Sequence, residues 1–330
     1  MRMALVGLGG IGNVHLSVYE SMPDVEIAAV VDVDTEKAAA RLKNKSIKMY
    51  NCIDDMLMSE NVDFVDICTP TYLHEEHAVK AMNKGVHVLC EKPIALTNES
   101  ADNMIKAAKA NGVIFMIAHV IRFWPHYEYL KKCYDERKFG KLYTAFFSRI
   151  GEIPRWTHDN WWMDEKRSGR APIDLHIHDA DFALYLLGKP NYITGKACED
   201  YENITYITAC YEYDDCLVNI EGGMFRAPYP FEMSYRAVFK RAVLEFRNNK
   251  LVVYEDGKKP EEIKFDNMQN IESGINISSA NGYENEIRYF IECVRTGKPP
   301  EITTPESSAE SLLMVKKTLE SAKLAQKIKI

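Results

Sequence analysis

The stretch Gly7–Gly12, Gly-Leu-Gly-Gly-Ile-Gly, constrains the fold of this chain more than any other. An uninterrupted apolar run at residues 3–6 precedes it, and such runs are typical of buried parallel strands. After it, apolar residues recur every fourth position over residues 14–22, which predicts a helix. The glycines therefore stand where a strand turns into a helix.

Each of the three spaced glycines has a physical role in such a turn. Gly7 permits a tight turn, Gly9 lets the backbone approach a pyrophosphate, and Gly12 lets the helix pack close to the strand. The first helical residues, Gly10 and Ile11, offer unpaired N–H groups at the positive end of the helix. The pattern predicts a turn that binds a dinucleotide.

An acidic residue follows at the expected distance. The run Val25–Val31 reads as a second strand that ends in Asp32, about 20 residues after Gly12, where a ribose-binding acid is expected. Its carboxylate can accept hydrogen bonds from both ribose hydroxyls and repels a 2′-phosphate, which predicts NAD as the cofactor. The alternative is a glycine-rich turn with a helix-capping aspartate. We prefer the dinucleotide because strand, glycines, helix and acid agree.

The order of strands and helices predicts two domains. Strands and helices alternate over residues 1–120, which predicts an α/β fold with a doubly wound parallel sheet, an NAD-binding Rossmann domain. In residues 121–330 we expect an α+β domain for substrate binding and oligomerisation. There, β-rich runs between Tyr192 and Tyr254 predict a large, open, mostly antiparallel sheet. A sheet face without helices must be buried against something, so we expect a homodimer or homotetramer.

Composition excludes several classes of function. The 330 residues carry a net charge of −7, which argues against a nucleic-acid partner. No apolar run approaches the roughly 20 residues that span a membrane. The eight cysteines are scattered without a C-x-x-C pair, so we expect reduced thiols that fill the core of a cytoplasmic protein.

A lysine follows a strand of the first domain, in Cys90-Glu91-Lys92-Pro93. Ligands of open α/β sheets bind outside the carboxyl ends of the strands, so Lys92 is expected near the reactive end of the cofactor. The proline that follows holds Lys92 in extended geometry. The alternative is a lysine in a surface loop.

A second group of polar residues lies at Asp174-Leu-His-Ile-His178-Asp-Ala-Asp181. If this segment is helical, Asp174 and His178 lie one turn apart on one face. A carboxylate beside an imidazole favours its charged form and fixes the ring, which suits proton transfer. Asp174, His176 and His178 could also be a metal site, but the helical pattern continues beyond them. We therefore predict no metal.

The chain resembles one known family. Its motifs occur in the family's order: Gly7-x-Gly9-x-x-Gly12-x-x-His15, Cys68-Thr69-Pro70 with His74, Glu91-Lys92-Pro93, Arg122-Phe123-Trp124-Pro125 and Asp174-x-x-x-His178-x-x-Asp181. They resemble the Gfo/Idh/MocA oxidoreductases, the group of glucose-fructose oxidoreductase and inositol dehydrogenase. The resemblance implies a Rossmann domain, a mixed α/β domain and oxidation of a sugar or polyol hydroxyl.

The same resemblance implies roles for individual residues. Lys92 would be the active-site lysine, His178 the acid/base and Asp174 its partner. The residues implied to line the cofactor are Thr69, Pro70, His74, Glu91 and Lys92. The sequence departs from the family just before Asp174, where Ser168-Gly-Arg-Ala-Pro172 replaces the usual run of glycines. His176 also stands where a small residue is common. These differences bear on the substrate rather than on the reaction class.

Other polar and aromatic side chains are candidates for binding the substrate; their alternative role is packing or a surface ion pair. They are His119, Arg122, Trp124, Arg155 and Trp162. The sequence thus predicts an NAD-dependent dehydrogenase that oxidises a secondary hydroxyl of a cyclic polyol, sugar or sugar derivative to a ketone. The alternative is a ligand-sensing regulator that keeps the fold without the chemistry. The substrate, the physiological direction and the choice of Lys92 or His178 as proton acceptor stay open.

Overall fold

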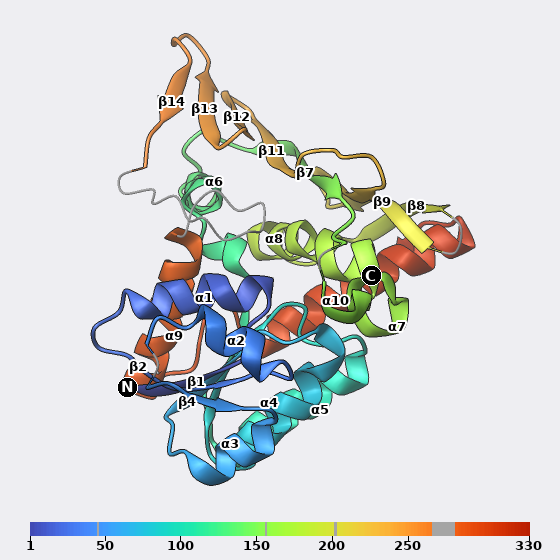
Figure 1. The fold of residues 1–330 in the computed structure, drawn as a ribbon. Helices are drawn as coiled ribbons and strands as arrows, with labels where there is room; N and C mark the ends of the chain where they lie inside the picture. The colour runs from blue at the N-terminus through green and yellow to red at the C-terminus, as the bar shows by residue number, and fades with distance from the viewer. Residues whose placement is uncertain (45, 156, 201–202, 266–280) are drawn as a thin grey trace. The chain divides into compact units, whose positions relative to one another are not determined.

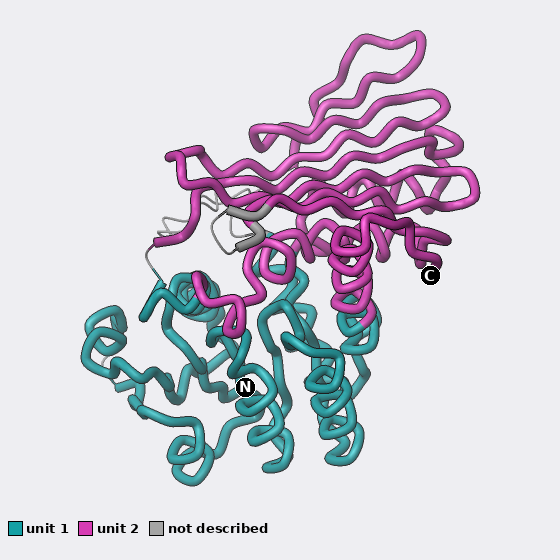
Figure 2. The backbone as a smooth tube through the Cα atoms, turned by 90° about the vertical axis from the view of Figure 1, so that its right-hand side faces the viewer, with its two compact units in different colours: residues 1–120, 157–161, 269–309 teal, residues 121–156, 162–268, 310–330 magenta. Residues whose placement is uncertain are grey.

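The computed structural model describes residues 1–44, 46–155, 157–200, 203–265 and 281–330. The chain divides into two compact units (Figure 2). Unit 1 comprises Met1–Val120, Thr157–Trp161 and Gln269–Ala309, and unit 2 comprises Ile121–Trp156, Trp162–Met268 and Glu310–Ile330. Unit 1 thus contains the whole of the sequence-predicted first domain, together with segments from much later in the chain.

The elements of unit 1 alternate between strand and helix, as the sequence predicts. They are β1 (Arg2–Val6), α1 (Gly10–Glu20), β2 (Glu26–Val31), α2 (Thr35–Arg41), β3 (Lys48–Tyr50), α3 (Ile53–Ser59), β4 (Phe64–Ile67), α4 (His74–Met82), β5 (His87–Glu91), α5 (Asn98–Asn111), β6 (Phe115–Ala118) and α9 (Asn281–Thr296), with a 3-10 turn at Thr71–Leu73.

The six strands form one parallel sheet in the order β3-β2-β1-β4-β5-β6. This is the order of a doubly wound Rossmann sheet, so the predicted fold of the first domain is confirmed. Helices α1 and α2 lie on one face of the sheet, and α3, α4 and α5 lie on the other (Figure 1). The central strand β4 is buried along its whole length, as expected for a strand covered on both faces.

Several helix ends follow directly from the sequence. The Asp34 side chain accepts a hydrogen bond from the Lys37 N–H at 3.1 Å and caps α2. Thr97 accepts a hydrogen bond from the Ser100 N–H at 3.0 Å and caps α5. At its other end, α5 stops at Gly112, whose φ of +63° is readily adopted by glycine. Local side-chain chemistry therefore sets these boundaries.

Helix α9 belongs to unit 1 although it lies near the end of the chain. It packs against α1. Its Phe290 ring meets Phe64 of β4 edge-on, with 5.3 Å between the ring centroids. Arg295 donates to the Asp24 carboxylate at 2.8 Å. A helix that the sequence analysis placed in the second domain therefore covers part of the first sheet.

Unit 2 contains a long sheet and a smaller number of helices. Its elements are α6 (Pro125–Asp135), β7 (Leu142–Glu152), α7 (Glu165–Ser168), a π-helical turn η4 (Ala171–His176), α8 (Ile177–Leu187), β8 (Tyr192–Asp200), β9 (Asn203–Glu212), β10 (Leu217–Phe225), β11 (Glu232–Phe239), β12 (Ala242–Arg247), β13 (Lys250–Glu255), β14 (Glu261–Ile263) and β15 (Ile328–Lys329). Helix α10 (Pro305–Leu324) and the 3-10 turns at Val120–Phe123 and His158–Met163 contain residues of both units.

The nine strands of unit 2 have the order β14-β13-β12-β11-β7-β10-β9-β8-β15. All neighbours are antiparallel except β7 and β10, which are parallel, so the predicted mostly antiparallel sheet is confirmed. Helices α6 and α8 lie on one side of this sheet, and no labelled helix lies on the other (Figure 1). We call this second side the open face; it carries alternate residues of β7 such as Phe146, Ser148 and Ile150.

The described helices and the cysteines agree with the composition. No helix in the described part of the chain has both the length and the apolar character that a membrane span requires. All eight cysteines are free thiols, and five of them are buried. Buried free cysteines pack as small apolar residues.

Turn η4 runs directly into α8 and packs tightly against β10. A β-carbon at Gly222 of β10 would lie 3.0 Å from the β-carbon of His176, so glycine permits this close approach. The ring of His176 is fully buried, and neither ring nitrogen has a hydrogen-bond partner among the described residues. Burial lowers the pKa of His176 from 6.5 to about 4. The ring is therefore neutral in the folded protein near pH 7.

This burial predicts a loss of stability in acid. Because the folded-state pKa lies below the unfolded value, the stabilisation is present above pH 6.5 and is lost as the pH falls towards 4. The loss attributable to His176 is about 2 kcal/mol between pH 7 and pH 5. Urea midpoints measured across this range should fall less steeply for His176→Leu than for the wild type. His158, which is exposed, supplies the control: for His158→Gln the urea midpoint should fall with pH as steeply as for the wild type. Equal slopes for His176→Leu and the wild type would contradict the prediction.

Candidate functional site

The glycine turn has the geometry of a dinucleotide cradle. Gly7 has a φ of +93°, and a β-carbon there would lie 2.9 Å from the carbonyl carbon of Cys68. A β-carbon at Gly12 would lie 2.1 Å from the Gly7 oxygen. At Gly9, by contrast, a β-carbon would meet nothing within 4 Å, so a ligand can approach the backbone. Helix α1 begins at Gly10, and its first N–H groups are available to a phosphate. These residues therefore fit NAD.

Asp32 lies at the end of β2 and is held beside this turn. Its carboxylate accepts hydrogen bonds from the Leu8 N–H at 2.8 Å and from the Asp34 N–H at 2.9 Å. The guanidinium of Arg41, in the last turn of α2, donates to the Leu8 carbonyl. The sequence analysis missed Arg41, because only the fold brings the end of α2 back to the glycine turn.

The turns that follow β4 and β5 are tied together by His74. Its Nδ1 lies 2.8 Å from the Pro93 carbonyl oxygen and its Nε2 lies 2.9 Å from the Thr69 carbonyl oxygen. Burial lowers the pKa of His74, although both carbonyl oxygens oppose that shift. Thr69 and Pro70 are half-buried beside it. His74 therefore fixes the cofactor side of the site through backbone carbonyls.

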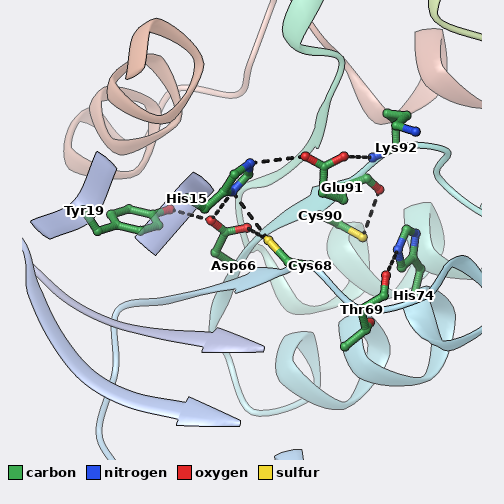
Figure 3. A network of polar contacts seen from close by, with 9 residues as sticks. All are labelled: His15, Tyr19, Asp66, Cys68, Thr69, His74, Cys90, Glu91 and Lys92. Atoms are coloured by element: carbon green, nitrogen blue, oxygen red, sulfur yellow. Dashed lines mark hydrogen bonds and ion pairs between the residues drawn. The ribbon is translucent and has the colours of Figure 1, made fainter. Parts of the chain in front are cut away.

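A buried polar network lies between α1, β4 and β5 (Figure 3). His15 Nδ1 lies 2.7 Å from Asp66 Oδ2, and His15 Nε2 lies 3.2 Å from Glu91 Oε1. Tyr19 donates to the same Asp66 oxygen at 2.9 Å. Although burial opposes a charged ring, the Asp66 carboxylate raises the pKa of His15 well above its usual value. His15 therefore lies between two carboxylates, with a hydrogen bond to Asp66 on one side and Glu91 at ion-pair distance, without a hydrogen bond, on the other.

The residue types of this network also occur in metal sites. Ligand atoms of His15, Asp66 and Cys68 lie within 4.8 Å of one another. However, the 2.7 Å between His15 and Asp66 is a hydrogen-bond distance. Burial also raises the pKa of the Cys68 thiol, whereas a metal binds the thiolate. The cluster is best described as a hydrogen-bonded network.

Asp174 and His178 share one face of the segment formed by η4 and α8. Both side chains are half-buried, whereas the three residues between them are buried. The indole N–H of Trp162 donates to Asp174 Oδ2 at 2.8 Å, and Trp162 itself is only 4% exposed. Trp162 thus holds the carboxylate that the sequence pairs with His178. A π-helical turn at this position is a common feature of functional sites.

The loop before η4 contains a backbone outlier. Arg170 has φ +53° and ψ −152°, a conformation that favours glycine. Its N–H donates to the Ser168 hydroxyl at 2.9 Å, and its guanidinium donates to the Met163 carbonyl. Such a conformation costs on the order of 1–3 kcal/mol and is commonly found at functional sites.

Two buried ion pairs fix α8. Arg149 donates to Asp179 at 2.9 and 3.2 Å. Arg122 donates to Asp181 at 2.8 and 2.6 Å, and Ser311 donates to the same carboxylate at 2.7 Å. Arg122 is therefore held in a buried ion pair, whereas the alternative considered from the sequence was packing or a surface ion pair; its contact with a substrate stays a prediction.

The other sequence-predicted residues have different environments. His119 and Trp124 are buried, and Arg155 is exposed and donates to the Arg226 carbonyl at 3.3 Å. Their contacts with a substrate stay predictions. Lys92 is half-buried, and its backbone N–H donates to Glu91 Oε2 at 3.1 Å.

Comparison with known families gives two matches along the chain. Residues 1–119 match the Gfo/Idh/MocA oxidoreductase family, NAD-binding Rossmann fold. Residues 127–245 match a Gfo/Idh/MocA C-terminal domain. The two matches follow one another and fall on the parallel sheet and on the first part of the mostly antiparallel sheet.

Individual relatives share parts of the chain. 2,7-Anhydro-N-acetylneuraminate hydratase of Escherichia coli is 34% identical over 59% of this chain and 52% of its own length. The scyllo-inositol 2-dehydrogenase (NADP(+)) IolU of Bacillus subtilis is 32% identical over 58% of this chain and 59% of its own. The chain thus spans little more than half the length of these relatives. Levoglucosan dehydrogenase, solved with NADH and levoglucosan, shares the fold, with a TM-score of 0.88, 18% identity and coverage of 100% of this chain and 99% of that one.

The position of Asp32 predicts a preference for NAD. A 2′-phosphate would be repelled by its carboxylate, so we expect NADH to bind at least about tenfold more tightly than NADPH, a difference of about 1.4 kcal/mol. Fluorescence titration with each cofactor measures this ratio. Asp32→Ala should lower the ratio of the two affinities, because Arg41 can then face the 2′-phosphate. Asp34→Asn, which keeps the helix cap, is the control and should leave the ratio unchanged. Equal affinities in the wild type would contradict the prediction.

Proposed function

Because this chain belongs to the Gfo/Idh/MocA family of oxidoreductases, with an NAD-binding Rossmann fold, we propose that it is an NAD-dependent dehydrogenase. Its substrate is a cyclic polyol, sugar or sugar derivative, in which a secondary hydroxyl becomes a ketone. The observation that carries the proposal is the set of groups able to handle that hydroxyl. Lys92 directly follows the carboxyl end of β5, and Asp174 and His178 share one accessible face. The names of relatives that act on inositol and levoglucosan support the substrate class.

Each group has a distinct role in this proposal. NAD, when bound, supplies the acceptor for the hydride of the substrate carbon. His178 takes the hydroxyl proton, since an imidazole ordinarily titrates at about pH 6.5. Asp174 orients the ring and stabilises its charged form, and Trp162 holds Asp174 by its 2.8 Å hydrogen bond. The Lys92 ammonium stabilises the developing alkoxide. The alternative is that Lys92 takes the proton, and the variants described below distinguish the two assignments.

A substrate panel tests the function. NADH formation is followed with inositols, aldoses, sugar acids and their phosphates, and we expect turnover with at least one cyclic polyol or sugar. Because one relative is named a hydratase, mass spectrometry should follow substrate consumption in parallel. Binding of a panel member without any turnover would instead favour the ligand-sensing regulator.

Substitution of the proton-handling groups should lower the rate rather than cofactor binding. We expect His178→Ala and Lys92→Ala each to lower kcat by about 10²–10⁴-fold, the usual cost of losing such a group. The affinity for NADH should be largely kept. Asp174→Asn should lower kcat by a smaller factor and shift the pH profile of kcat, because it removes a charge next to the His178 ring.

Two controls make these variants interpretable. Lys84 is exposed on unit 1, and Lys84→Ala should leave kcat unchanged. If His178→Ala keeps a near-normal kcat and an unchanged pH profile, His178 is not the base, and Lys92 takes that role. If both Lys92→Ala and His178→Ala keep normal rates, the proposed mechanism is wrong.

We also propose that the open face of the second sheet joins copies of this chain into a homodimer or homotetramer. A shallow depression on the sheet of unit 2 is lined by residues that include Phe146, Ile150 and Tyr229, with Glu232 and Arg236 among the polar ones. Mixed apolar and charged surfaces of this kind are typical of protein interfaces. A cytoplasmic location is proposed as well, because eight free thiols suit a reducing compartment.

The assembly is tested by light scattering at micromolar concentration. We expect a mass of at least twice the 37.8 kDa of one chain. Phe146→Glu should lower that mass because it places a charge in the interface. Lys132→Gln makes the same change in charge at an exposed side chain of α6 and should leave the mass unaffected. A monomer mass for the wild type would contradict the proposal.

A further inference from the structure

We propose that His15 is a positioning residue for Lys92 and acts on it through the Glu91 carboxylate. The inference deepens the proposed function and rests on the role given there to Lys92. No motif reading assigns His15 this role, because its two carboxylate partners lie far from it in the sequence.

The Glu91 carboxylate connects the two residues directly. One oxygen, Oε1, lies 3.2 Å from His15 Nε2. The other, Oε2, accepts the Lys92 N–H at 3.1 Å. Glu91 is 5% exposed, and a buried carboxylate is stabilised by a nearby cation; the His15 ring, whose pKa is raised by Asp66, is the neighbour at ion-pair distance. Loss of that cation would free Glu91 to change its position and with it the hydrogen bond to Lys92.

His15 is itself fixed from the opposite side. Its Nδ1 lies 2.7 Å from Asp66, whose carboxylate is also held by the Tyr19 hydroxyl at 2.9 Å. With one nitrogen on Asp66 and the other near Glu91, the ring has no alternative orientation that keeps both contacts. Figure 3 shows the chain of contacts from His15 through Glu91 to Lys92, with Tyr19 outside it on Asp66. The chain starts on α1, the helix whose first turn forms the cofactor cradle, and ends at the carboxyl end of β5.

The Lys92 turn is anchored on its other side by His74. The Pro93 carbonyl oxygen lies 2.8 Å from His74 Nδ1. The residue before Lys92 is thus held through its side chain, and the residue after it through its carbonyl group. Two buried histidines therefore contact the residues on either side of Lys92; the pKa of His15 is raised and that of His74 is lowered.

The test compares four variants in the full-length protein: His15→Gln, Glu91→Gln, the double variant and Tyr19→Phe. Tyr19 contacts Asp66 at the end of the network remote from Lys92, so Tyr19→Phe is a matched control for disturbance of the buried network. The measurements are kcat with myo-inositol or the fastest panel substrate, the Kd for NADH, and the exchange rate of the Lys92 amide hydrogen by NMR.

We expect His15→Gln and Glu91→Gln each to lower kcat about 10- to 100-fold, as a misplaced catalytic group does. The Kd for NADH should stay within about threefold, and the Lys92 amide should exchange faster. The double variant should be no slower than the slower single variant, because both changes remove one connection. Tyr19→Phe should lower the melting temperature but keep kcat within about twofold.

Three results would overturn the inference. They are independent, multiplicative losses in the double variant, an equal loss of kcat in Tyr19→Phe, or a loss in NADH affinity that accounts for the whole effect in Glu91→Gln. If His15→Gln does not fold, Glu91→Gln and Tyr19→Phe still decide the question through kcat and amide exchange. The Lys92→Ala variant distinguishes a failure of this inference from a failure of the proposed function. If Lys92→Ala keeps a normal kcat, Lys92 has no catalytic role and the proposed function fails as well.

Discussion

Helix α8 depends on two buried arginine–carboxylate pairs, and it carries His178, the proposed proton acceptor. Arg149 with Asp179 and Arg122 with Asp181 form two-point contacts in which no side chain is more than 4% exposed. Removing one partner of such a pair typically costs about 3–5 kcal/mol, because the other charge stays buried. Burial raises the pKa of Asp179, although Arg149 opposes that shift. The half-buried His178 therefore lies on a firmly held helix.

The features that the sequence predicted well are those set by short-range chemistry. The glycine turn and the acid Asp32 that follows it depend on neighbouring residues only, so their signals are readable in the chain itself. The doubly wound sheet follows from alternating elements, each of which has a clear apolar pattern. Lys92 could be placed at the edge of the sheet because it directly follows a strand.

The features that sequence reasoning missed depend on which elements become neighbours. Asp66 lies in β4 and reads as part of an apolar strand, and only the strand order brings it to His15. The hydrogen bond from Trp162 to Asp174 likewise requires the fold of the intervening loop. Arg122 was considered for substrate binding, but a buried guanidinium needs a countercharge, which Asp181 supplies. A polar residue inside an apolar pattern thus indicates a buried polar network, but the sequence does not indicate which residues it contacts there.

The packing of α9 on the first sheet means that this sheet cannot be fully covered until late in synthesis. Phe64 emerges with the early strands, whereas its partner Phe290 comes from near the end of the chain. At translation rates of about 5–20 residues per second, roughly 10–30 s separate the completion of the sixth strand from the arrival of α9. During that interval an apolar part of the parallel sheet is uncovered on the nascent chain. Transiently exposed apolar surface of this kind makes a partly folded chain prone to aggregation until the covering helix is made.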